Sequence, residues 1–307
     1  MSIITRTLQR CHLGEPVVRD ALTIVPLLLD TESTFAQDYM PLAAALERGT
    51  ARVTELSEGG SVPRLMLHND GDLAVFILDG EELVGAKQNR VSNVSILAPA
   101  KHSMPIPVSC VERGRWSYRT REFSSSPYRI YAMAHAKQMS AVTASLRASG
   151  AHSGDQSEVW SSVAEQSVAL RSPSPTDSMF DAYETRRKSL NELLEGLEPV
   201  ERQVGALFGI GDRVVGAEFF ESPTVFASFF RKIVSGYAMD SYLRHNQGTV
   251  DPNEFDLLLS QLQSVVPMPF PAVGLGDDLR LEDTELTGAA LTFDDRIIHL
   301  AAFRRAH

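Results

Sequence analysis

The chain has 307 residues, of which 43% are hydrophobic and 22% are charged, values that are ordinary for a globular protein with a well-filled core. Its formal net charge of -10 argues against broad contact with a nucleic-acid backbone. The two cysteines, Cys11 and Cys110, give no support for a disulfide scaffold or a thiolate metal site. Because the sequence shows neither a secretory h-region nor an apolar run long enough to cross a bilayer, we expect a cytoplasmic protein without a membrane partner.

The first region of the chain, residues 1–125, is predicted to be rich in β-strands. Residues 22–29 form an apolar run typical of a buried strand, in which Pro26 indicates a bend or an edge position. Helical spacing follows over residues 34–48, with Ser33 or Thr34 as the cap, and Pro41 is expected to leave only the second half as a firm helix. Short β-rich segments separated by turn signals then favour a mostly antiparallel sheet system, and these segments are RVTEL, RLMLHN, LAVFILD, VSNVSIL and PIPVSCV.

The rest of the chain is predicted to contain a helical region, 126–198, and a second α+β unit, 199–307. Helices are expected over residues 128–147, 156–170 and 179–194, with a Ser/Pro-rich linker at 172–177. The second unit should begin with a hairpin around Gly209–Asp212 and continue with a long helix that has Ser222 as cap and Pro223 at its first position. A helix near 253–265, a Pro-rich loop and closing strands at 279–282, 286–293 and 297–303 follow. The predicted class is therefore α+β, either as these three regions or as one composite domain.

Positive charge is concentrated between residues 81 and 129. This stretch carries eight lysines and arginines against four glutamates, so it contributes 8 - 4 = +4 to a chain whose total is -10. A local surplus of this kind indicates a local anion-binding site rather than non-specific electrostatic binding over the whole surface.

The first polar string in this region is GEELVGAKQNR, residues 80–90. Its carboxylates are candidates for a general base or a magnesium ligand, and its cations, Lys87 and Arg90, for phosphate binding. On one straight strand Glu82 and Arg90 would lie roughly 26 Å apart, at about 3.3 Å per residue. A shared site therefore requires the chain to turn, at Gly85 or around Gln88–Asn89. The alternative interpretation is a solvated strand and turn with charged ends.

The second string is SCVERGRW, residues 109–116. Cys110 falls on the apolar face of a strand and is interpreted first as a buried small hydrophobe; a cysteine-phosphatase loop would need one more residue before its arginine. Glu112 beside Arg113 and Arg115 should stay ionised, which suits anchoring or metal binding better than acid catalysis. Trp116 offers a surface on which a base could stack, although it could equally cap the core.

These two strings, as ILDGEELVGAKQNR and IPVSCVERGRW, resemble the signature of the ADP-ribosylglycohydrolase- and rhodanese/phosphatase-associated protein family. The later segment GDRVVGAEFFESPTVFASFFRKIVSGYAMDSY is similar to that family's strand–helix segment. The family takes its name from genomic association with enzymes that remove ADP-ribose or handle phosphate. The resemblance therefore implies a pathway and not a reaction.

Together these observations predict a site for an ADP-ribose, NAD-derived or nucleotide phosphate ligand, with Mg²⁺ as a candidate cofactor. The expected catalytic residues are Glu82 and Glu112, which suit a hydrolase of ADP-ribosyl or phosphoester bonds. The expected ligand-binding residues are Lys87, Gln88, Asn89, Arg90, Arg113, Arg115 and Trp116. Two alternatives are a sensing module without turnover and an assembly partner of an ADP-ribose-handling enzyme, or of a second copy, through the aromatic helix at 224–242.

Overall fold

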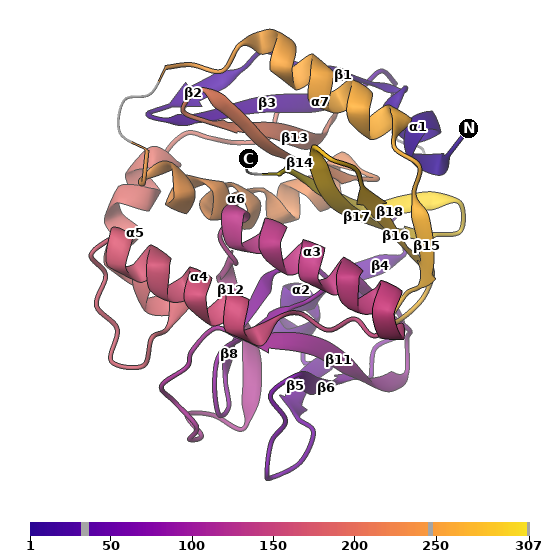
Figure 1. Ribbon diagram of the computed structural model, residues 1–307. Helices are drawn as coiled ribbons and strands as arrows, with labels where there is room; N and C mark the ends of the chain where they lie inside the picture. The colour runs from indigo at the N-terminus through magenta and orange to yellow at the C-terminus, as the bar shows by residue number, and fades with distance from the viewer. Residues whose placement is uncertain (32–36, 245–247, 306–307) are drawn as a thin grey trace.

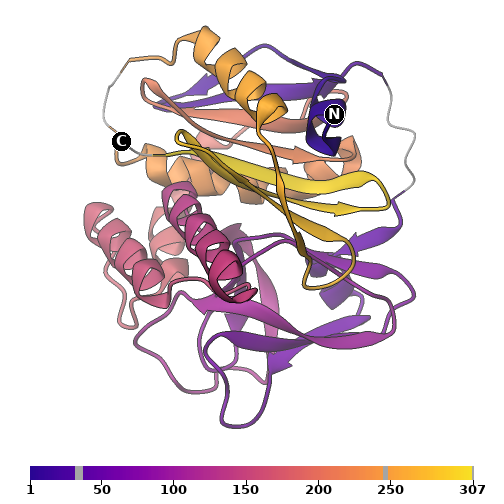
Figure 2. The same ribbon diagram turned by 45° about the vertical axis from the view of Figure 1, so that its right-hand side comes forward.

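The computed structural model describes residues 1–31, 37–244 and 248–305 and confirms the α+β class. It consists of a large antiparallel sheet at one end, a closed barrel at the other, and helices above the sheet and between the two (Figure 1). No helix in the described ranges is long and apolar enough to cross a membrane. The layers remain distinct when the molecule is turned (Figure 2).

The large sheet has the strand order β1-β3-β13-β14-β18-β17-β16-β15, with β2 paired to β3. Its strands are β1 (Cys11–Leu13), β2 (Val17–Arg19), β3 (Leu22–Leu29), β13 (Gln203–Ile210), β14 (Arg213–Phe220), β15 (Met268–Pro271), β16 (Asp277–Glu282), β17 (Leu286–Phe293) and β18 (Arg296–Arg304). Strands from residues 1–125 and from residues 199–307 thus belong to one sheet. The hairpin expected at Gly209–Asp212 is confirmed as the turn between β13 and β14, whereas β15 lies in what the sequence indicated as a Pro-rich loop.

Pro26 does not mark an edge strand, because β3 is paired on both sides. On one side it pairs with β13 along its length, and on the other with β2 near its start and β1 near its end. Pro26 lies between these two short partners, where the Gly14 amide donates to its carbonyl at 2.8 Å. A proline, which has no N–H to donate, is accommodated there because neither short strand needs that donor.

The barrel closes in the order β11-β6-β5-β12-β8-β9 and is antiparallel throughout. Its strands are β5 (Ala51–Glu55), β6 (Arg64–Asn69), β8 (Glu81–Gly85), β9 (Arg90–Ser92), β11 (His102–Cys110) and β12 (Glu122–Arg129). A small sheet of β4 (Tyr39–Pro41), β7 (Ala74–Ile77) and β10 (Ile96–Ala98) accompanies it, with one parallel pair, β4 with β7. The mostly antiparallel arrangement was predicted, but β12 was not, and the helix expected from residue 128 begins only at Ala132.

The helices are α1 (Ile3–Leu8), α2 (Leu42–Glu47), α3 (Ala132–Ser149), α4 (Gln156–Ala169), α5 (Met179–Leu193), α6 (Pro223–Ser241) and α7 (Pro252–Ser264). α1 and α7 cover the outer face of the large sheet, while α3 and α6 lie between the sheet and the barrel (Figure 1). α2 keeps only the second half of its predicted range, as expected, and the proposed caps Ser33 and Thr34 lie outside the described residues.

The long helix α6 begins as its sequence predicts. The Ser222 hydroxyl accepts from the Val225 amide at 3.2 Å, and Pro223 occupies the first turn, where its missing N–H costs nothing. Its aromatic side chains Phe226, Phe229 and Tyr237 are buried inside the chain itself. The prediction that this aromatic face is free to bury against another chain is therefore wrong.

A buried network of charged side chains joins the barrel to the sheet. Arg129 on β12 donates to Glu218 on β14 at 2.8 Å and to His135 on α3 at 2.6 Å. His299 on β18 binds the other Glu218 oxygen at 2.9 Å, and His135 lies 3.2 Å from Asp79. Burial would raise the pKa of Asp79, but the histidines and Arg129 lower it instead, so the carboxylate is ionised.

Replacing Arg129 with methionine should destabilise the protein strongly. The substitution keeps much of the side-chain volume but leaves Glu218 and Asp79 buried without their cation, which costs about 3–5 kcal/mol in comparable pairs. The measurement is the free energy of unfolding in urea. As a control, Arg187→Met removes an exposed pair with Glu184 and should cost less than about 0.5 kcal/mol. Equal costs for the two variants would show that the network does not hold the layers together.

Candidate functional site

The two polar strings predicted to form a site meet in the barrel as neighbouring strands. Arg90 on β9 pairs with Leu83 of β8 on one side and with Cys110 of β11 on the other. The turn predicted at Gly85 or around Gln88–Asn89 is present between the end of β8 at Gly85 and the start of β9 at Arg90. Gly85 has φ +136°, and a Cβ there would lie 2.6 Å from the Thr120 hydroxyl, so only glycine fits. Cys110 is buried, as expected, and its thiol donates to Gln88 Oε1 at 3.2 Å.

Glu112 is held by donors from three segments of the chain. Arg115 binds it in a bidentate manner, from Nε to Oε1 at 2.9 Å and from Nη2 to Oε2 at 2.6 Å. The Asn89 amide and the Thr176 hydroxyl donate to the same carboxylate at 3.0 and 2.9 Å. Burial would raise the pKa of Glu112, but these hydrogen bonds outweigh it and lower the pKa. Glu112 is therefore an ionised anchor, as its arginine neighbours predicted.

Arg115 is fully engaged within the protein. Besides Glu112, its guanidinium donates to the carbonyls of Gly85, Ala86 and Ser117 and to Asn89 Oδ1. These bonds account for the five N–H groups of an arginine. Arg115 thus fixes the turn of the first string to the loop of the second and has no donor left for a ligand.

The segment at 172–177 also contributes to this cluster. The Gly114 amide donates to the Thr176 carbonyl at 2.8 Å, and a Cβ on Gly114 would lie 2.8 Å from Thr176 Cα, so the loop approaches this segment closely. The Met179 amide donates to the Val111 carbonyl at 2.9 Å just beyond it. The Ser/Pro-rich segment therefore lies against the second string.

The pKa of Glu82 is shifted in the opposite direction to that of Glu112. Both of its carboxylate oxygens are buried, and no hydrogen bond of ordinary geometry reaches either of them in the described part of the chain. Burial raises the pKa of Glu82 to about 8; the Ser126 hydroxyl opposes this shift, and the charge of Glu112 adds to it. Its neighbour Glu81 is paired instead, with Lys232 Nζ at 2.6 Å. The pKa of Glu82 is thus raised and that of Glu112 lowered, and acid–base sites use pairs of carboxyl groups whose pKa values are shifted apart in this way.

Cations and exposed aromatic rings lie together on the outer side of this cluster. Lys87 Nζ lies 5.3 Å from the Trp116 ring and 5.1 Å from the Tyr118 ring, while the Arg90 guanidinium lies 5.7 Å from Trp116. The two rings are 46% and 50% exposed, so Trp116 does not cap the core. Arg90 and Asn89 are buried, and neither Arg90 Nη2 nor Asn89 Nδ2 has a hydrogen-bond partner among the described residues. Arg113 lies apart, its guanidinium 5.3 Å from the Trp160 ring.

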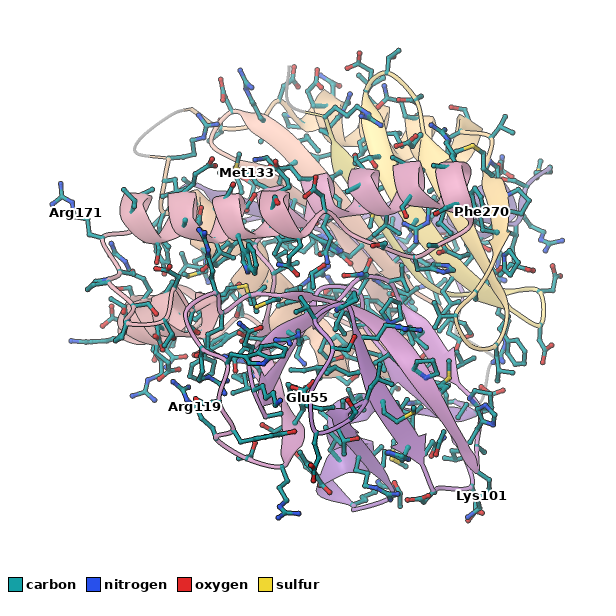
Figure 3. All side chains as sticks on the ribbon, turned by 60° about the horizontal axis from the view of Figure 1, so that its bottom comes forward. Glu55, Lys101, Arg119, Met133, Arg171 and Phe270 are labelled. Atoms are coloured by element: carbon teal, nitrogen blue, oxygen red, sulfur yellow. The ribbon has the colours of Figure 1, made fainter. Side chains whose placement is uncertain are left out.

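Two clefts flank the loop that carries these rings. One, of about 790 Å³, is lined by Thr54, Glu55, Ser57, Glu58, Tyr118, Arg119, Thr120 and Arg121. The other, of about 440 Å³, is lined by Arg119, Pro173, Pro175, Thr176, Asp181, Glu184 and Thr185. Arg119 belongs to both and reaches within 3.5 Å of Glu112. Figure 3 labels Arg119 on its loop beside the barrel. Neither Glu82 nor Glu112 is among the lining side chains.

Arg119 was not singled out as a site residue from the sequence, although it contributes to the positive surplus of residues 81–129. Glu55 and Thr176 carried no signal at all, because they reach the site from distant parts of the chain. No three His, Cys, Asp or Glu side chains within residues 1–31, 37–244 and 248–305 are arranged to hold a metal ion.

A family model with the description "ARG and Rhodanese-Phosphatase-superfamily-associated Protein domain" matches residues 10–303. The chain belongs to this family. The match includes both polar strings, the barrel and nearly all of the large sheet, so the family domain comprises the sheet and the barrel together and not the motif region alone. Searches of curated proteins and of solved structures returned no significant match.

Arg115→Met should destabilise the protein by about 3–5 kcal/mol, because it leaves the buried Glu112 carboxylate without its bidentate partner. Arg113→Met, two residues away and exposed, should cost at most about 1 kcal/mol, the usual value of an exposed cation–π contact. Urea unfolding of both variants measures the difference. A small effect of Arg115→Met would contradict its anchoring role.

Glu82→Gln should change how stability depends on pH. A carboxyl whose pKa is raised from 4.5 to about 8 on folding binds a proton that the unfolded chain has released, so its contribution is lost as pH rises between these values. The wild type should therefore lose stability relative to Glu82→Gln from pH 5 to 8, by up to about 1.4 kcal/mol per pH unit. The midpoint of urea unfolding at several pH values measures this slope. An exposed control, Glu198→Gln, should follow the wild type, and parallel profiles for Glu82→Gln would refute the neutral state of Glu82.

Proposed function

We propose that the protein binds an ADP-ribose-like or other nucleotide phosphate ligand across the two clefts that meet at Arg119. The observation that carries this proposal is that one half-exposed arginine lines both clefts. A guanidinium in that position offers two parallel N–H donors to a phosphate group, and an elongated ligand with a central diphosphate would extend to either side of it.

The groups around Arg119 match the other parts of such a ligand. Tyr118 and Trp116 present exposed rings on which an adenine could stack, with the ammonium of Lys87 beside them. Glu58, which is exposed in the larger cleft, is a suitable acceptor for ribose hydroxyls. The family's name, which refers to association with ARG and the Rhodanese-Phosphatase superfamily, supports a ligand of this class.

A binding role is favoured over turnover, because neither Glu82 nor Glu112 lines a cleft, and Arg119 and Thr176, which do, cover Glu112. A hydrolytic role, on ADP-ribosyl or phosphoester bonds, is supported by the raised pKa of Glu82, which would let its neutral carboxyl donate a proton to a leaving group. That role requires the ligand to reach Glu82 when bound. Mg²⁺ enters this proposal only as a companion of the ligand's phosphates, and a cytoplasmic location near an ADP-ribose-handling enzyme belongs to the same proposal.

The test is thermal unfolding and calorimetric titration with ADP-ribose, NAD, ADP and AMP, each with and without Mg²⁺. A ligand at about 100 times its dissociation constant adds roughly 2.7 kcal/mol to stability, which raises the melting temperature visibly. Arg119→Ala should weaken binding about tenfold or more, since it removes a charge-assisted contact.

The matched control is Arg48→Ala, an exposed arginine at the end of α2 that lines neither cleft. It should bind as the wild type does. If no nucleotide binds, the proposal fails and an assembly role with a neighbouring enzyme is favoured. If a ligand binds, incubation followed by chromatography of the products separates sensing from hydrolysis, and only hydrolysis should be lost in Glu82→Gln.

A further inference from the structure

A separate cavity of about 110 Å³ lies where the first turn of α3 meets the β13–β14 hairpin, the end of α6 and the end of β18. Met133, one of its lining residues, is well removed from Arg119 and Glu55 in Figure 3. None of the side chains that line this cavity lines the two clefts of the proposed nucleotide site.

The wall of this cavity is largely apolar. Its apolar side chains come from α3, β13, β14 and β18 and are Ala132, Met133, Ala136, Ile210, Val214, Val215 and Phe303. An apolar cavity of about 150 Å³ is known to accept benzene, so this smaller space suits a compact apolar group no larger than a benzene ring.

The polar part of the cavity lining is strongly cationic. Arg213, Arg244, Arg304 and Arg305 line it against one carboxyl group, Asp240, in a chain whose net charge is -10. Arg305 is paired with Glu282 at 2.9 Å, and Arg304 lies 3.6 Å from Glu254. Arg213 and Arg244 are exposed, and no ion pair to either is found within the described ranges.

Asp240 limits the charge that this cavity can accept. It is buried and accepts from the Met133 amide at 2.8 Å and from Gln166 at 3.2 Å, so its carboxyl already satisfies the first turn of α3. Burial raises the pKa of Asp240 to about 7, against the opposing effect of its hydrogen bonds and of the Arg244 charge. A carboxyl in the wall opposes a dianion more than a monoanion.

We propose that this cavity is a second binding site, for a small organic monocarboxylate whose apolar body fills the pocket and whose carboxylate is bound by Arg213 and Arg244. The apolar wall selects the body, and the guanidinium forks select the planar carboxylate. The ligand class thus differs from the nucleotide phosphates of the proposed function, and the site does not depend on that proposal.

The experiment is calorimetric titration of the full chain with benzoate, and with benzamide as the neutral analogue of the same shape, at constant ionic strength. Benzoate should bind at least tenfold more tightly than benzamide, because only the anion gains the arginine contacts. Arg213→Ala and Arg244→Ala should each weaken benzoate binding about tenfold. Both residues are exposed, so the variants should fold, which their melting temperatures verify.

Two controls locate the site. Ala136→Leu adds bulk to the cavity wall and should abolish benzoate binding, whereas Arg48→Ala and Arg119→Ala should leave it unchanged. Equal binding of benzoate and benzamide, or tight benzoate binding that survives both arginine substitutions, would overturn the proposal. An absence of benzoate binding, even at concentrations high enough to compete with chloride for the arginines, would also overturn the proposal.

Discussion

The ion pair between Arg129 and Glu218 holds the barrel and the large sheet in one structure. Arg129 ends the barrel strand β12, and Glu218 lies within β14 of the sheet, so their bond at 2.8 Å crosses from one layer to the other. His135 and His299 surround this pair and connect it to Asp79 at the turn before β8. Because buried charges are tolerated only when partnered, this network defines how closely the two layers approach.

The position of the first polar string follows from that arrangement. Asp79 and Gly80 lead directly into β8, and the Ile130 amide donates to the Gly80 carbonyl at 2.9 Å, next to Arg129. β8 then turns at Gly85 into β9, which pairs with β11 and brings Asn89 to Glu112. Glu112 and Arg115 in turn anchor the loop that exposes Trp116, Tyr118 and Arg119. The proposed nucleotide site is therefore built on a rigid internal frame, and the side chains available to a ligand are the outer ones.

Some elements of this structure follow from local sequence, and others do not. Ser222 and Pro223 define the start of α6 because a cap and a first-turn proline act within one turn of the helix. Strand β12, EFSSSPYR, was missed because its serines and Pro127 favour a loop; it is a strand because β5 and β8 supply partners on both sides, with an irregularity in the register around Pro127. The same reason applies to Glu112, whose ionised state was predicted from nearby arginines, whereas its bonds to Asn89 and Thr176 join positions distant in the chain.

The sequence by itself determined the α+β class, most helices and strands, a turn within the first polar string and the family, since each depends on local spacing or on a contiguous string of residues. Only the tertiary structure decided which polar side chains are available to a ligand. Arg115 and Arg119 are both arginines of one short loop, yet the first is consumed by internal acceptors and the second lines two clefts. That difference arises from strand pairing and burial, which bring together groups from the whole chain and are not encoded in any single segment.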